Sequence, residues 1–103
     1  MLYVHATTLR DLPSIRKHGL LTRYHRLRRP AVWLCSHHMG GWAAAHAMRR
    51  HRLAPQDVVL VYVELPRSAV RRFRHRGLYW CPADVPPSAI RRVETYAVRV
   101  LEE

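Results

Sequence analysis

The sequence is poor in several kinds of residue, and each scarcity excludes a class of protein. Cysteine occurs only twice, as Cys35 and Cys81, without a CxxC pair, which favours free thiols in a reducing compartment over a disulfide framework. No run approaches the roughly 18 apolar residues that a membrane span requires, and the N-terminus lacks an apolar signal core. The sequence therefore predicts a cytoplasmic protein that does not span a membrane.

Acidic residues are also scarce. The chain has 7 Asp and Glu against 18 Lys and Arg, for a formal net charge of +11, and Lys17 is the single lysine. Such an excess of positive charge predicts an anionic partner, with nucleic acid the first candidate. A GC-rich genome is the alternative explanation, but that bias accounts for arginine in place of lysine and not for the excess itself.

The 103 residues, 49% of them hydrophobic, fit a single globular domain without repeats or a linker. Asp11 fits a helix N-cap and Gly19 the residue that ends that helix. A second helix is expected at 40–53, and 67–77 reads as a short basic helix or turn. Strands are expected at 2–6, 31–36, 58–65 (central, from its continuous apolar run), 78–81 and 91–101. This order predicts an α+β domain with a mixed or antiparallel sheet.

His5 is the first candidate for chemistry, because it stands alone in a strand. A lone strand histidine is usually a satisfied core or edge residue. Here the hydroxyls of Thr7 and Thr8 follow directly, where a strand end can present donors and acceptors to a ligand. An imidazole can bond a ribose hydroxyl while the adjoining backbone holds an amide, so nucleotide recognition is the functional alternative.

Cys35, His37, His38 and His46 form a candidate cluster for metal binding. The single residue between Cys35 and His37 suits few zinc patterns, so we expect no metal site. His37 and His38 are expected at the mouth of a cleft, where they would add positive charge below neutral pH.

Two basic runs, "RYHRLRR" and "RRFRHR", alternate arginine with aromatic residues and histidine. Arginine can hold a phosphate backbone while rings stack on bases, which suits a partly single-stranded nucleic acid. The alternative is the solvated face of a cationic protein. The predicted nucleic-acid-binding residues are Arg26, Arg28, Arg29, Arg72 and Arg74.

Four segments in order resemble the ADP-ribosyltransferase fold as found in RNA 2′-phosphotransferases. They are "LYVHATTLRDLPSIRKHGL", "VWLCS" with the Ala-rich helix after it, "DVVLVYVEL" and "LYWCPADVPPSAIRRV", which together span Leu2 to about Val93. The resemblance implies one minimal ADP-ribosyltransferase-like α+β domain over residues 1–103. Its split mixed or antiparallel sheet, with short helices, would form two small sheets around a nucleotide cleft, with NAD as the cofactor.

The same resemblance assigns roles to individual residues. His5 matches the histidine that contacts the NAD ribose, Ala6 replaces the usual glycine, and Thr7 keeps the third motif position. Trp33 falls where an aromatic residue stacks on the nicotinamide ring, and Ser36 follows where a phosphate or ribose could be bonded. His5 and Trp33 are thus the catalytic candidates, and all five are cofactor-binding candidates.

One landmark of the mono-ADP-ribosylating members is missing. They place a glutamate before the "PP" loop, where this chain has Leu78 and Tyr79; RNA 2′-phosphotransferases also lack it and work through basic residues. Glu64 and Asp84 are the mid-chain acids, and we expect them to end a strand and to shape the Pro-rich loop.

The function expected is an NAD-dependent transferase acting on phosphorylated nucleic-acid ends, either by RNA 2′-phosphotransferase-like chemistry or by ADP-ribosyl transfer. The alternative is a catalytically inactive nucleic-acid-binding module of the same fold. A toxin-like enzyme that modifies protein or DNA is disfavoured by the missing glutamate. The separate N-terminal RNA-binding lobe of the phosphotransferases has no counterpart in these 103 residues.

Overall fold

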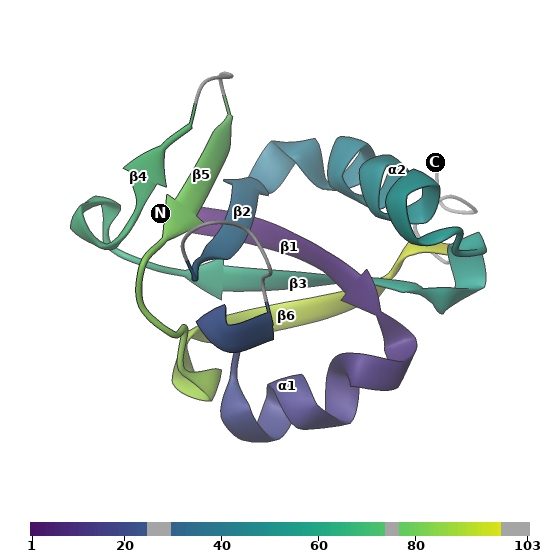
Figure 1. The fold of residues 1–103 in the computed structure, drawn as a ribbon, viewed down its shortest axis with the longest axis horizontal. Coiled ribbons are helices and arrows are strands. Elements are labelled where there is room, and N and C mark those ends of the chain that lie inside the picture. Colours follow the sequence, from purple (N-terminus) through teal and green to yellow (C-terminus); the bar gives the residue numbers. More distant parts are fainter. Residues whose placement is uncertain (25–29, 74–76, 98–103) are drawn as a thin grey trace.

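The computed structural model describes residues 1–24, 30–73 and 77–97. They form an α+β fold with one six-stranded sheet in the order β4-β5-β2-β1-β3-β6 (Figure 1), so the predicted class is confirmed. Every described pair of strands is antiparallel, which removes the mixed alternative. The elements are β1 Leu2–Thr8, α1 Leu12–His18, β2 Val32–Ser36, α2 Gly40–His51, β3 Val58–Glu64, β4 Arg71–Arg72, β5 Leu78–Cys81 and β6 Ile90–Thr95.

The first helix begins and ends where the sequence predicts. Asp11 is its N-cap, and Gly19 closes it with a φ of 80° and an N–H that donates to the Ile15 carbonyl at 2.7 Å. A Cβ at Gly19 would collide with the carbonyl oxygen of Val85, which accepts from Leu20. Glycine is therefore needed there for both its backbone conformation and its missing side chain.

Two predicted elements differ from the structure. In the described part of 67–77, a 3₁₀ turn, Arg67–Ala69, is followed by β4. Pairing of β4 with β5 satisfies the backbone better than an isolated short helix would. The last strand, expected over 91–101, runs from Ile90 to Thr95, and residues 98–101 lie outside the described part of the chain.

The core lies on both faces of the sheet, as Figure 1 shows with α1 and α2 on opposite sides of β1, β3 and β6. All of β3 except its last residue is buried, and alternate residues point to the two sides. Val59, Val61 and Val63 join Tyr3 on the α1 side, which we call the α1 face. Val58, Leu60 and Tyr62 join Val4 and alanines of α2 on the α2 face. The buried apolar run is thus an inner strand, next to the edge strand β6.

The sheet has a narrow junction between its two halves. The ladder between β1 and β3 has seven pairs along the whole of β1, whereas β1 and β2 share two pairs, Tyr3 with Ser36 and Val4 with Cys35. The resemblance predicts two small sheets. The described strands instead form one sheet, in which β4-β5-β2 and β1-β3-β6 meet along these two pairs. Beyond Val4, β1 pairs with β3 alone.

No helix in the described ranges is long and apolar enough to cross a membrane.

Candidate functional site

His5 lies one residue past the junction of the two half-sheets. Its Nδ1 is 2.7 Å from the backbone carbonyl oxygen of Trp33 on β2. A carbonyl only accepts hydrogen bonds, so Nδ1 carries the proton and donates. Loss of hydration lowers the pKa of His5, and the bond to Trp33 raises it by a smaller amount. The imidazole is therefore neutral at neutral pH, and its Nε2 holds a lone pair.

This bond gives His5 a structural role. The main-chain ladder between β1 and β2 ends at the pair Val4 and Cys35. Beyond this pair, the imidazole of His5 donates to the carbonyl of Trp33 on β2. A side chain thus ties the two half-sheets together where their backbones part.

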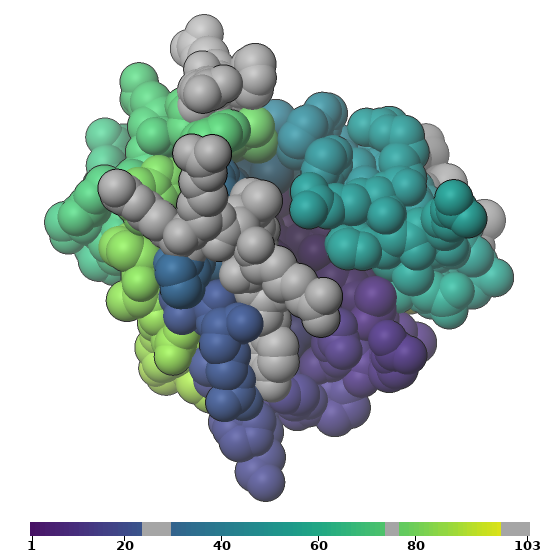
Figure 2. Space-filling view, in the orientation of Figure 1, coloured from purple at the N-terminus to yellow at the C-terminus, as the bar shows by residue number. Residues whose placement is uncertain are grey.

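The second nitrogen of the ring is accessible. Nε2 bonds no residue of the described part of the chain, and none of the described side-chain nitrogens or oxygens is both sealed from solvent and unpaired. Nε2 is therefore not completely sealed from solvent. Figure 2 shows the surface hollowed beside α2, with β1 at the bottom of the hollow. The ring thus has one nitrogen occupied by the fold and one left for a ligand.

Trp33 lies on the other face of the sheet. Val32 and Leu34, its neighbours on β2, point to the α1 face, so the indole points to the α2 face, where it pairs with Trp80. Its ring meets Phe73 edge-on, with centroids 4.9 Å apart. His5 alternates with Val4 and shares the α1 face with Tyr3. The register therefore does not place the His5 and Trp33 side chains together; the Trp33 carbonyl connects them instead.

The other cofactor-binding candidates divide in the same way. Ala6 packs against the α2 face, so its methyl group points away from the side chain of His5. Thr7, two residues beyond His5, shares the α1 face. Ser36 is buried at 8% exposure, and its N–H donates to the Gly77 carbonyl at 2.9 Å. Of these three, Thr7 alone shares the face of His5 without being buried.

The structure describes one of the five predicted arginines, Arg72. Arg26, Arg28, Arg29 and Arg74 lie outside the described residues, whereas Arg72 is exposed on β4. His37 and His38 are exposed on a 3₁₀ turn before α2, with ring centroids 5.4 Å apart. Within the described ranges, no three His, Cys, Asp or Glu side chains are grouped as a metal site would need.

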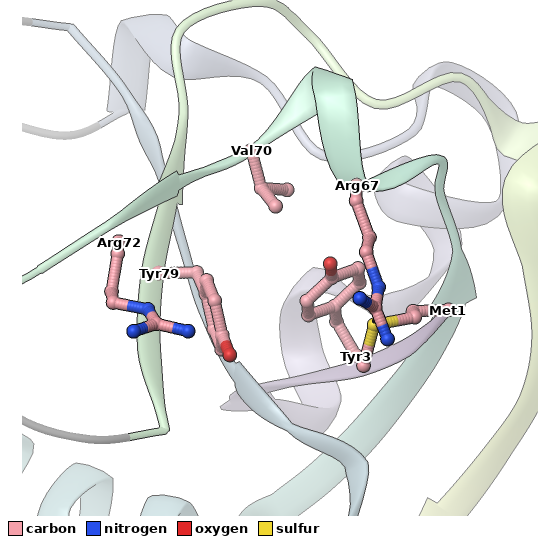
Figure 3. Close-up of a pocket in the computed structure, with 6 residues that line it drawn as sticks. All are labelled: Met1, Tyr3, Arg67, Val70, Arg72 and Tyr79. Atoms are coloured by element: carbon pink, nitrogen blue, oxygen red, sulfur yellow. The ribbon is translucent and has the colours of Figure 1, made fainter.

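A pocket of about 300 Å³ opens on the α1 face (Figure 3). Tyr3 and Tyr79 form its aromatic wall, with ring centroids 5.2 Å apart and planes at 71°. Arg72 enters it because it pairs with Tyr79 across β4 and β5. The sequence singled out Arg72 but missed the two tyrosines and Arg67. Strand pairing brings Tyr3 and Tyr79 to the pocket, and the connection between β3 and β4 brings Arg67. The pocket is lined by Met1, Tyr3, Arg67, Val70, Arg72 and Tyr79.

Glu64 and Asp84, the two mid-chain acids, have the structural roles that the sequence predicts. Glu64 ends β3 and lies 2.9 Å from the amino group of Met1. Asp84 accepts from the N–H of Thr22 at 2.8 Å, a bond that lowers the pKa of its carboxyl group and fastens the Pro-rich loop.

The two cysteines are free, as expected, and both are buried. Burial raises the pKa of the Cys35 thiol to about 11, so the thiol is protonated at neutral pH and is a poor nucleophile.

No protein-family model matches the chain, and no curated protein is significantly similar to it.

Proposed function

We propose that the protein is an NAD-dependent transferase with an ADP-ribosyltransferase-like fold that acts on phosphorylated nucleic-acid ends. The observation that supports the proposal is His5: a neutral imidazole, fixed through Nδ1 where the two half-sheets part, whose Nε2 bonds no described residue and is not completely sealed from solvent. The narrow junction supports the fold assignment, because each half of the sheet is otherwise paired within itself.

The residues around His5 fit a ribose and an amide. Nε2 would accept a hydrogen bond from a ribose hydroxyl, since the neutral ring keeps its lone pair there. Past Val4, the edge of β1 that faces β2 has no ladder partner on β2, so main-chain groups of residues 5–8 would hold a carboxamide. The methyl group of Ala6 points to the opposite face and leaves this approach open. Bound NAD would supply an ADP-ribosyl group through cleavage of its bond to nicotinamide.

The ionised state of a phosphate makes it the favoured acceptor of the ADP-ribosyl group. A phosphate is already ionised and needs no general base, whereas a hydroxyl acceptor needs one. Of the five described carboxylates, four have a partner in the fold: Asp11, Glu64, Asp84 and Glu94. Arginine side chains would hold the phosphates. The Trp33 side chain points to the other face of the sheet. The proposal therefore rests on His5 and does not include stacking of Trp33 on the nicotinamide ring.

A pair of substitutions tests the role of His5. In His5→Asn the amide nitrogen takes roughly the place of Nδ1 and can donate to Trp33, but Nε2 is gone. Calorimetric titration with NAD should give saturable binding to the native chain and a loss of at least about tenfold in the variant, while the melting temperature of the variant stays close to the native value. Native affinity in His5→Asn would mean that the histidine serves the fold alone.

Turnover is tested with labelled NAD and matched oligonucleotides that carry or lack a terminal or 2′-phosphate. We expect consumption of NAD only with the phosphorylated member of each pair. Labelling of the unphosphorylated oligonucleotide would refute the phosphate route.

The second candidate, a nucleic-acid-binding module without turnover, is favoured by exposed aromatic rings on a cationic protein. Trp42 is 44% exposed and stacks on His46, and Phe73 is 39% exposed next to Arg72. Rings and arginines in this arrangement suit single-stranded nucleic acid. Oligonucleotide binding that weakens steeply with salt, without consumption of NAD, would select this candidate.

A further inference from the structure

The pocket on the α1 face is built by a connection that crosses the molecule. β3 and β4 are successive in the chain but lie on either side of β1, β2 and β5 in the sheet. The connection between them carries Arg67 and the buried Val70 over one side of the pocket, while Tyr3 and Tyr79 rise from the sheet on the other. Figure 3 shows the two arginines at opposite ends, with both tyrosines between them.

The hydroxyl group of Tyr3 opens into this pocket. The residue is 1% exposed, yet its hydroxyl bonds no residue in the described ranges, and no described side-chain oxygen is both sealed and unpaired. Burial, and the Tyr79 phenol next, raise the pKa of Tyr3, so the group remains a protonated donor at neutral pH. Since it has no partner among the described residues, the Tyr3 hydroxyl can donate a hydrogen bond to a ligand or to water.

The guanidinium groups of the pocket have no acidic partner in the described part of the chain: neither Arg67 nor Arg72 pairs with a carboxylate there. The Nε of Arg67 donates to the sulfur of Met1 at 2.8 Å, which leaves its terminal nitrogens for another acceptor. Glu64, which acts electrostatically on Tyr3, is neutralised by the amino group of Met1 at 2.9 Å. The pocket therefore offers two positive charges and two phenols.

The size and chemistry of the pocket select a small oxyanion. About 300 Å³ is at the lower end of the range for ligand sites, so it admits a charged group and not a whole dinucleotide. Guanidinium groups bind phosphate oxygens in pairs, and phenols donate to the remaining ones. We propose that this pocket binds a phosphate monoester group, held by Arg67 and Arg72 with the hydroxyl groups of Tyr3 and Tyr79 as hydrogen-bond donors. Its ligand is the phosphate of a nucleotide or of a nucleic-acid end.

The site goes beyond the proposed function, because phosphate binding here needs neither NAD nor His5. Tyr3 nevertheless lies two residues before His5 on the same face of β1, so a phosphate in the pocket would be a neighbour of the imidazole. Phosphate binding without NAD consumption would support this inference and refute the proposed function. NAD consumption without phosphate binding in the pocket would support the proposed function and refute this inference.

Titration with inorganic phosphate at low salt, followed by NMR and calorimetry, tests the pocket. Tyr3→Phe removes one donor without removing a hydrogen bond within the described fold, and Arg72→Gln removes one exposed charge. We expect saturable binding by the native chain, weakened about threefold or more by Tyr3→Phe and about fivefold to tenfold by Arg72→Gln. Arg50→Gln, an exposed position on α2 with the same charge change, should bind within twofold of the native chain.

Three results would overturn the inference: no saturable binding by the native chain, unchanged affinity in both pocket variants, or an equal loss in Arg50→Gln. Competition then identifies the source of the phosphate. Displacement by adenosine monophosphate assigns a nucleotide, and displacement only by a 5′-phosphorylated oligonucleotide assigns a nucleic-acid end. Failure of both to compete would refute the monoester assignment.

Discussion

The structural bond made by His5 can be separated from any role in binding. His5→Ala removes the donor at 2.7 Å from the Trp33 carbonyl, and the main-chain ladder between β1 and β2 provides no replacement there. Loss of the His5 donor from this part-buried hydrogen bond costs about 1 kcal/mol or more. A domain of this size loses roughly 4–8 °C of melting temperature per kcal/mol, so we expect a decrease of at least about 4 °C.

Urea unfolding followed by tryptophan fluorescence gives the change in free energy directly. His5→Asn is the matched control, because its amide can donate to the same carbonyl, and it should recover most of the loss. Equal stability of the native chain and His5→Ala would refute the assignment of His5 as the tie between the half-sheets. Equal loss in both variants would show that ring packing and not the hydrogen bond stabilises the fold.

The same histidine sets a pH dependence. Its folded pKa lies below the ordinary 6.5, so between these two values the unfolded state binds more protons and the free energy of unfolding rises with pH. The contribution is fully present above about pH 6.5 and is lost as the pH falls toward the folded pKa. The native chain should therefore lose stability relative to His5→Asn on acidification through this window. A difference between the two proteins that stays constant with pH would contradict the lowered pKa.

Three further predictions concern the core and the turns. Because the pKa of Cys35 is raised from 9.0 to about 11, the folded state keeps a proton that the unfolded state loses between these pH values. The free energy of unfolding should therefore fall as the pH rises through this range. Alkylation of the native thiol should be slow until urea is added. Leu60→Ala, at a fully buried position on the α2 face, should cost about 3–5 kcal/mol by urea unfolding, against less than about 0.5 kcal/mol for exposed Leu9→Ala. Gly19→Ala should cost at least about 2 kcal/mol, since it adds a collision with Val85 to a positive φ; a smaller loss would mean that the loop moves aside.

The sequence by itself determined the elements whose signals are local. The apolar run of β3 is buried along its length, and Asp11 and Gly19 bound α1, because periodicity, capping and a glycine turn depend on residues close together in the chain. The α+β class followed from the order of these elements. The last strand was placed too far along the chain because continued alternation does not tell where its partner ends: β3 pairs with β6 only as far as Thr95.

The tertiary structure alone decided what surrounds the candidate residues. The sequence could single out His5 as unusual, but the partner of its Nδ1 is a carbonyl 28 positions away, brought near by the point at which β1 and β2 part. The sequence also did not tell which face of the sheet each side chain occupies. The resemblance groups Trp33 with His5, yet the two-residue period of each strand and the register between strands place their side chains on opposite faces. Arg72 meets Tyr79 and Tyr3 because four strands, β4, β5, β2 and β1, lie side by side in the sheet. Long-range strand register is a property of the whole sheet, and no local pattern in the chain specifies it.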